Sequence, residues 1–436
     1  MRRIIVCADG TWESAFFQTR DDMLTNVGRL VNAINARDDR DGAVEQVKYY
    51  LPGLGTGEET LQGALTGALG AGLLEQVRQV YYFIAQNWTE GDEIMLFGFS
   101  RGAYVCRLLT ALLHMVGVLD PKTNLHLFPA IFNALCLPKD THSEAGEQNE
   151  AKLDALLKEI QPFVEAQEEA AHGGFFVKVL ALFDCVPLLH LNLLHPALPL
   201  TPFSTEDALL EPTVQHVFQA LSLDECRTPY KAIEFVQDPV AEERGQELTQ
   251  VWFAGCHGDI GGGYTPHDLS DLSLHWLVSQ VEPFVALDYT YLSSISASPS
   301  APWGTQEQHH GFHITSGKER KFPLPLPRSV TPKATGQTQF LHPSILRQPR
   351  SALPRRLRRA IEDAERAGAR LGEGGVWWPM APWERQVQAR WAVKDGRERE
   401  GTKSASRGKE RKPGLWRTRL VEVYNAGDAP SLARAR

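Results

Sequence analysis

The sequence contains no long hydrophobic run. Nowhere do about 18 uncharged apolar residues follow one another, which is the length that a membrane-spanning helix needs. The first segment, "MRRIIVCADGTW", begins like a signal peptide, but its short apolar run soon meets Asp9 and Gly10, which predicts a strand and a turn. We therefore expect no transmembrane segment, and a chain that is either cytoplasmic or secreted by a route that needs no signal peptide.

Cysteine is also scarce and scattered. The chain has six cysteines among 436 residues, at positions 7, 106, 136, 185, 226 and 256. Most of them lie within apolar stretches, which predicts reduced thiols in the core and argues against a disulfide framework.

Positive charge is scarce in the first two thirds of the chain. The net charge of -8 hides an asymmetry, because residues 301–436 hold 27 Lys and Arg against 13 Asp and Glu, while residues 1–300 are strongly acidic. An acidic body predicts no nucleic acid at the main site, but a basic tail is free to contact an anionic membrane.

Two motifs for phosphate chemistry are incomplete. The Gly-rich stretch "GLGTGEET" (53–60) lacks the Gly-Lys-Ser/Thr of a P-loop. The "DGT" at residues 9–11 resembles a haloacid-dehalogenase motif, but Cys7 stands where that motif needs a second aspartate. The sequence thus implies no cofactor and no metal.

What the chain does contain is an alternation of strand and helix patterns. Short apolar runs that end in turns predict buried parallel strands over 2–10, 47–55, 93–100, 175–184 and 248–259. Amphipathic stretches between them predict helices over 26–37, 73–88, 103–117 and 213–227. The predicted fold class is α/β, a mostly parallel sheet with helices on both faces.

We predict a catalytic domain over residues 1–350 and a basic extension over 351–436 that is partly helical (353–371) and partly disordered (394–414). Residues 118–172 interrupt the alternation and predict a helical cap or lid. Residues 185–204 form an apolar loop that either receives an acyl chain or packs on the core. The tryptophan-rich segment 375–391 is expected to pack on the domain, with a membrane interface as the alternative.

The stretch "EIMLFGFSRGAYVCRLL" (93–109) contains Gly-x-Ser-x-Gly around Ser100. A strand precedes this motif and a helix pattern follows it, which is the context of a nucleophile elbow in serine hydrolases. The two glycines permit a tight turn that raises the serine above the sheet. We therefore expect Ser100 to be a nucleophile, with a structural small residue as the alternative.

A serine nucleophile needs a histidine base and an acid that orients it. Asp184 and His257 both lie at the ends of predicted strands, so they would meet Ser100 at the carboxyl edge of the sheet. The alternative acid and base are Asp259 and His342.

The oxyanion needs two backbone N–H groups. Arg101, directly after the serine, is expected to supply one. Gly10 or Thr11 in "ADGTW" is expected to supply the other, unless this is an ordinary turn.

Several motifs together resemble one family in their order along the chain. They are "IVCADGTW", "LPGLGTG", "GDEIMLFGFSRGAYVCRLL", "FDCV", "ALSLDECR", "VWFAGCHGDIGGGY" and "HPSILR". They are similar to the α/β hydrolase domain of type VI secretion phospholipase effectors of the first lipase class and of uncharacterised bacterial and fungal relatives. The resemblance covers roughly residues 2–347. It implies a Ser-Asp-His esterase with phospholipase A activity, carried by Ser100, Asp184 and His257.

The sequence thus predicts a serine hydrolase that cleaves carboxylic esters, with an acyl lipid such as a phospholipid as substrate and an anionic membrane as a peripheral partner of the basic tail. Two alternatives stay open. One is a cytosolic carboxylesterase or thioesterase that acts on small acyl substrates. The other is a catalytically silent hydrolase fold that serves as a binding module.

Overall fold

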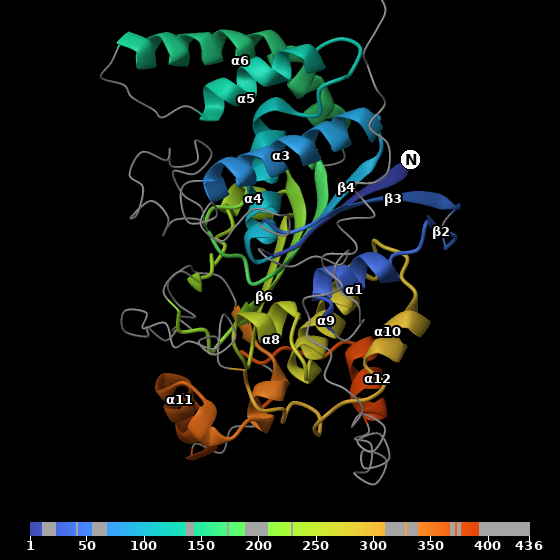
Figure 1. The fold of residues 1–436 in the computed structure, drawn as a ribbon, viewed down its shortest axis with the longest axis vertical. Coiled ribbons are helices and arrows are strands. Elements are labelled where there is room, and N and C mark those ends of the chain that lie inside the picture. Colours follow the sequence, from blue (N-terminus) through green and yellow to red (C-terminus); the bar gives the residue numbers. More distant parts are fainter. Residues whose placement is uncertain are drawn as a thin grey trace, which may run out of the picture. The chain divides into compact units, whose positions relative to one another are not determined.

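The structure, a computed structural model, has an eight-stranded sheet at its centre (Figure 1). It describes residues 1–10, 23–40, 42–54, 68–136, 144–171, 174–187, 208–227, 230–309, 328, 339–366, 371–372 and 376–391. The strands are β1 (Arg2–Ala8), β2 (Arg37–Asp38), β3 (Val44–Leu51), β4 (Glu93–Phe99), β5 (Val177–Phe183), β6 (Val214–Ser222), β7 (Glu247–Phe253) and β8 (Gln339–Leu341). Their order across the sheet is β2-β3-β1-β4-β5-β6-β7-β8, and every neighbouring pair is parallel except β2 with β3.

Helices cover both faces of this sheet, as Figure 1 shows. The first face carries α3 (Ala68–Asn87), α4 (Ser100–Val116), α5 (Phe128–Cys136) and α6 (Glu144–Ala170). The second face carries α1 (Asn26–Ala33), α9 (Asp268–Val281), α10 (Tyr289–Ile295) and α12 (Pro382–Arg390). The other α-helices among the described residues are α7 (Pro239–Glu243), α8 (His257–Gly261) and α11 (Arg355–Arg366). The architecture is α/β hydrolase-like, as predicted.

The alternation of side chains along β1 explains why helices are needed on both faces. Ile4, Val6 and Ala8 point into the core under α3 and α4, while Ile5 and Cys7 point into the core under α1 and α9. All five are fully buried. A strand that is buried on both faces has a continuous apolar sequence, and this pattern is why β1 could be predicted.

The stretch 213–227 is the clearest error of the prediction. It was expected to be a helix, but it forms β6, which pairs with β5 and β7 in the middle of the sheet. His216 accordingly lies on a strand, where its Nδ1 is 2.9 Å from Glu247 Oε2 and its ring packs against Phe284. The spacing of its apolar residues fits a helix as well as a fully buried strand, so periodicity alone could not decide.

The insert after α4 forms two helices, α5 and α6, and packs on the outer side of α4. Gln167 of α6 bonds both the N–H and the C=O of Val118, just beyond the end of α4. Ser100 begins α4, and a helix of its 17 residues is about 25 Å long. The contacts with Val118 therefore lie at the end of α4 opposite Ser100, and a lid role for residues 118–172 stays a prediction.

The described part of the chain after residue 339 packs on this same body. Trp378 meets Trp276 of α9 edge to face at 6.1 Å, and Trp383 does the same with Tyr289 at 4.7 Å. Packing of the segment 375–391 on the domain is thus confirmed. The contacts within the chain divide it into two units. The first spans Met1–Ala392, and the second, Val393–Arg436, lies outside the described residues. Most of the apolar loop 185–204 also lies outside them.

All six cysteines lie in described residues, and no two of them form a disulfide. Within the described ranges, no helix combines the length and the apolar character that crossing a bilayer would require.

Candidate functional site

Ser100 sits at the turn where β4 ends and α4 begins. Its φ is 57°, a left-handed value that few residues other than glycine adopt. A backbone conformation of this kind costs on the order of 1–3 kcal/mol, which the surrounding structure must offset. The sequence therefore forms the strained strand-to-helix turn that the Gly-x-Ser-x-Gly pattern predicts.

The two glycines of the motif allow the turn to pack tightly. A Cβ on Gly98 would lie 2.5 Å from the Cα of Ala103, and one on Gly102 would lie 2.3 Å from the carbonyl oxygen of Ala8. Both distances are far below van der Waals contact, and both involve backbone atoms that cannot swing away. Glycine is thus required at both positions by the close approach of α4 to β1 and to its own turn.

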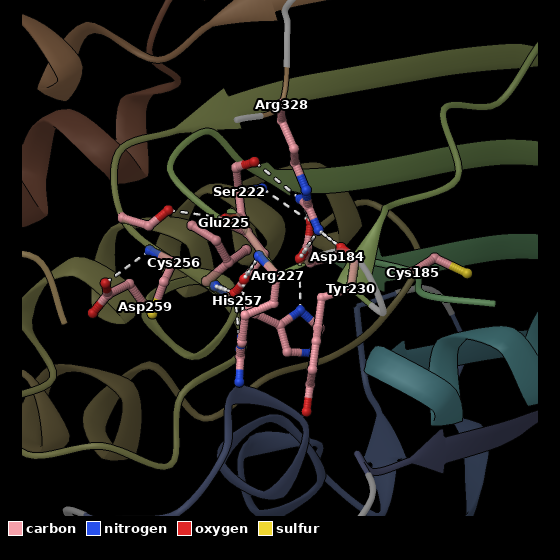
Figure 2. Close-up of polar contacts among 12 residues, drawn as sticks. Asp184, Cys185, Ser222, Glu225, Arg227, Tyr230, Cys256, His257, Asp259 and Arg328 are labelled. Atoms are coloured by element: carbon pink, nitrogen blue, oxygen red, sulfur yellow. Dashed lines mark hydrogen bonds and ion pairs between the residues drawn. The ribbon is translucent and has the colours of Figure 1, made fainter. Parts of the chain in front are cut away.

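Asp184 and His257 form a buried pair at the same edge of the sheet. Asp184 follows β5, and His257 is the first residue of α8, after β7. His257 Nδ1 lies 2.6 Å from Asp184 Oδ2 (Figure 2). Asp184 is fully buried, and His257 is 5% exposed. The other ring nitrogen, His257 Nε2, is buried and has no hydrogen-bond partner among the described residues.

Packing holds His257 close to the serine turn. Its ring lies 4.7 Å from the ring of Phe99, the residue directly before Ser100. On the other side of the turn, the N–H of Val186, two residues after Asp184, donates to the Ser100 carbonyl at 3.3 Å. The residues predicted as nucleophile, acid and base are therefore gathered by three strand ends.

The environment sets the charge of both members of the pair. Burial alone would raise the pKa of Asp184, but the charge of Arg328 and the hydrogen bond from His257 outweigh it and lower that pKa to about 2. Burial lowers the pKa of His257 despite the bond to Asp184. At neutral pH the pair is thus an ionised carboxylate beside a neutral imidazole. Nδ1 then donates to Asp184, and Nε2 carries the free lone pair.

The alternative acid and base do not pair with each other. Asp259 Oδ1 lies 2.6 Å from His309 Nδ1, and its Oδ2 accepts from the N–H of Cys256 at 2.9 Å. His342 instead contacts Glu384 at 3.1 Å and Ser344 at 2.7 Å. Both residues thus bond to partners other than Ser100. The contacts of Asp259 stabilise the start of α8, and those of His342 stabilise the packing of α12.

The predicted oxyanion residues are only partly described. Gly10 lies beside the serine, since a Cβ built on it would be 3.2 Å from Ser100 Cβ. Its N–H, however, donates to its own neighbour Asp9 Oδ1 at 2.8 Å. Thr11 lies outside the described residues. Arg101 is the second residue of α4, a position whose N–H has no acceptor within the helix.

A buried set of residues around His257 was not predicted. Glu225 binds Arg227 at 2.8 Å and accepts from the N–H of His257 at 3.2 Å. Both members of this ion pair are buried. The ring of Tyr230 lies edge-on to His257 at 5.0 Å. Arg328 stands in a Pro-rich stretch that carries no local signal for such a role.

Among the described residues, no three His, Cys, Asp or Glu side chains are grouped so that they could hold a metal ion.

One family model matches more than half of the chain. The model of the family described as "T6SS, Phospholipase effector Tle1-like, catalytic domain" matches residues 2–280. An uncharacterized protein of Saccharomyces cerevisiae is 32% identical over 132 residues, which cover 27% of this chain and 18% of that protein.

Two solved structures are also similar to the chain. The Tle1 effector bound to the VgrG spike of the type 6 secretion system has 17% identity and a TM-score of 0.34, over 61% of this chain and 52% of that one. An uncharacterized protein from Pseudomonas aeruginosa has 16% identity and a TM-score of 0.36, over 66% of this chain and 46% of that one. The chain thus spans about half the length of these two structures.

Proposed function

Because the chain belongs to the type VI secretion Tle1-like phospholipase effector family, whose catalytic-domain model matches residues 2–280, we propose that it is a serine hydrolase that cleaves carboxylic esters of phospholipids. The observation that carries this proposal is the buried Asp184–His257 pair, whose Nε2 has no partner among the described residues, placed beside a serine in a left-handed turn. The family supports the lipid class of the substrate, and the geometry supports the ester chemistry.

In the proposed reaction Ser100 Oγ attacks the carbonyl carbon of the ester, and its proton passes to His257 Nε2. The negative charge that forms on the carbonyl oxygen is stabilised by backbone N–H groups at Arg101 and in the loop after β1. Collapse of this intermediate breaks the ester bond, and His257 returns the proton to the leaving alcohol. Water then releases the fatty acid from Ser100 by the same steps.

The charges of the site suit these steps. The imidazole must be neutral to accept a proton, and burial lowers the pKa of His257 below its usual range. Asp184, ionised because its pKa is about 2, stabilises the imidazolium that forms during the reaction. A base of this kind typically contributes about 10²–10⁴-fold of rate.

Labelling by a fluorophosphonate probe tests the nucleophile. We expect the probe to attach to Ser100, and Ser100→Ala to abolish both labelling and ester hydrolysis. Ser279→Ala, a part-buried serine of α9 whose Oγ bonds the His275 carbonyl, is the matched control and should change neither. A folded protein that the probe does not label would favour the alternative of a silent binding module.

The substrate class requires a second measurement. We expect faster hydrolysis of a phospholipid in micelles or vesicles than of a short-chain ester in solution. Equal or better turnover of the monomeric soluble ester would favour the alternative of a carboxylesterase or thioesterase.

A further inference from the structure

Arg328 makes more contacts with Asp184 than His257 does. Its Nη1 lies 2.6 Å from Asp184 Oδ1, and its Nη2 lies 3.0 Å from Asp184 Oδ2. The N–H of Ser222 also donates to Oδ1 at 3.0 Å. The carboxylate is therefore held from two sides, with the guanidinium on one and the imidazole on the other, as Figure 2 shows.

The Arg328 side chain is itself built into the site. It is 8% exposed, and its remaining Nη contacts are to backbone carbonyl oxygens, at 2.9 Å to Ser222 and with a short bond to Tyr230. Its Nε is buried without a hydrogen-bond partner among the described residues. Burying an arginine whose Nε has no partner lowers the stability of the fold, so stability alone does not account for Arg328 at this position.

We propose that Arg328 is a positioning residue of the reaction: it fixes the Asp184 carboxylate against His257 Nδ1 and offsets part of its charge, so that the imidazole stays neutral at lower pH. This inference rests on the proposed function, because it takes His257 as the base. A planar guanidinium that binds both oxygens fixes the orientation of a carboxylate, which a point charge cannot do.

The sign of the effect follows from the charged groups that face His257. Asp184 and Glu225 are negative and favour the imidazolium, while Arg227 and Arg328 are positive and disfavour it. The rings of Phe99 and Tyr230 also pack against the imidazole. Removing the charge of Arg328 therefore leaves Asp184 more strongly negative, and the pKa of His257 should rise.

Arg328 also links the acid to the wall of the site. Its bond to the Tyr230 carbonyl holds the residue whose ring lies edge-on to His257, and over which Arg101 stands at 5.2 Å. Loss of Arg328 should thus loosen the packing on one side of the imidazole as well as the hold on Asp184.

The test compares Arg328→Gln and Arg328→Lys with the wild-type chain, and uses Arg78→Gln as control. Arg78 is an exposed residue of α3 that pairs with Glu75, so its variant makes the same charge change away from the site. Two quantities are measured: kcat/KM against pH with a soluble short-chain ester, and the titration of His257 by NMR of histidine-labelled protein, assigned with His257→Gln.

For Arg328→Gln we expect two pKa values to rise together, by about 0.5–1 pH unit. One is the apparent pKa of the acidic limb in the pH profile of kcat/KM, and the other is the pKa of His257 measured by NMR. This corresponds to about a 3- to 10-fold loss of kcat/KM on the acidic limb, with a smaller loss above it. Arg328→Lys keeps the charge, so the acidic limb of its kcat/KM profile should stay near the wild-type pH. Its kcat should fall several-fold, because lysine cannot bind both carboxylate oxygens in a fixed orientation. Arg78→Gln should match the wild type in both measurements.

An unmoved His257 titration in folded Arg328→Gln would overturn the inference. If that variant does not fold, the Arg328→Lys variant tests the inference instead. A wild-type kcat in the lysine variant would show that the bidentate contact between Arg328 and Asp184 has no role in the reaction. A His257 titration that shifts while the kinetic limb does not would instead count against His257 as the base, and hence against the proposed function.

Discussion

Two imidazole–carboxylate pairs in this molecule have opposite properties because their surroundings differ. His257 and Asp184 are both buried, and burial lowers the pKa of His257. His309 is only partly buried, and its bond to Asp259 raises the pKa of His309 above its usual value. Near neutral pH the first pair offers a neutral base, while the second favours an ion pair. Contact geometry alone, 2.6 Å in both cases, does not separate them.

Substitutions of single residues test the assignment of the base and the acid. His257→Gln should lower kcat by about 10⁶-fold and Asp184→Asn by about 10⁴-fold, because each removes a member of a unit that acts together. His342→Gln should keep most of the activity, since His342 contacts Ser344 and Glu384 instead of the site. Steady-state kinetics on a soluble ester would check this, with circular dichroism to confirm folding. Comparable losses in His342→Gln and His257→Gln would contradict the assignment.

Of the residues at the candidate site, the sequence predicted three and gave no signal for Arg328 and Tyr230. Ser100, Asp184 and His257 follow strands, and the carboxyl ends of parallel strands meet at one edge, so chain pattern alone brings them together. Arg328 and Tyr230 also lie near His257 and Asp184, but neither residue belongs to one of these strand ends. Their positions depend on tertiary packing, which no local pattern reports.

At the scale of elements, α4 is the part on which the serine turn depends. Gly102→Ala would place a methyl group 2.3 Å from the Ala8 carbonyl oxygen, so α4 must move away from β1. We expect a loss of about 1–3 kcal/mol in the free energy of unfolding, the range for overpacking, together with a loss of activity.

Gly72→Ala is the matched control for this substitution. Gly72 lies in α3, and its Cβ would meet only the end of the Leu54 side chain, at 3.1 Å. Denaturant unfolding followed by fluorescence should show Gly72→Ala close to the wild type. A Gly102→Ala protein that is as stable and as active as the wild type would show that the approach of α4 to β1 is looser than described.

The start of α8 should respond to pH. Asp259 accepts from the N–H of Cys256 and binds His309, whose pKa is raised by that bond. A raised folded-state pKa means that the stabilisation is complete below the unfolded value of about 6.5 and is lost as pH rises through the folded value. Nearby, burial and then the charge of Asp259 raise the pKa of Asp224 to about 7, which also lowers stability as pH rises toward 7.

We therefore expect the melting temperature to fall between pH 6 and pH 8.5, and to fall less in His309→Gln. Because Asp224 remains in that variant, the difference between the two proteins reports on His309. Parallel curves for the two proteins would mean that the Asp259–His309 pair adds no pH-dependent stability.

Among the elements, β6 shows where pattern reasoning fails. A central strand that is buried on both faces has no polar alternation to mark its period, so Val214–Ser222 resembles a buried helix segment. Five of the eight strands could be predicted because turn residues follow them directly. The short β2 and β8 are edge strands of two and three residues, too short to give a pattern.

At the scale of the whole molecule, charge is distributed unevenly along the chain. Residues 351–436 carry 20 Lys and Arg against 11 Asp and Glu, and the end of this stretch lies in the second unit, Val393–Arg436. Each basic residue near an anionic bilayer contributes about 1 kcal/mol, and the attraction fades beyond about 8–10 Å. The proposed role of the tail is to hold the enzyme on anionic membranes.

Removal of residues 396–436 tests this role. Sedimentation with vesicles that contain anionic lipid should show weaker binding of the truncated chain, most clearly at low salt, and slower hydrolysis of those vesicles. Turnover of a soluble short-chain ester should not change, because the described site lies within Met1–Ala392. If both chains bind and cleave anionic vesicles equally, the tail does not act in this way.

Two residues of the proposed site, Ser100 and Asp184, have φ values of 57° and 45°, in a region where glycine is far less strained. Ser100→Gly would therefore relieve strain and raise thermal resistance, and it would remove the proposed nucleophile by the same change. At Asp184 the contacts of the carboxylate outweigh the strain, because its loss would leave the buried Arg328 guanidinium and His257 without their partner. For an engineer, the gain at Ser100 makes heat resistance a misleading selection criterion. A library screened for survival on heating would be enriched in inactive proteins unless each survivor were also required to turn over an ester.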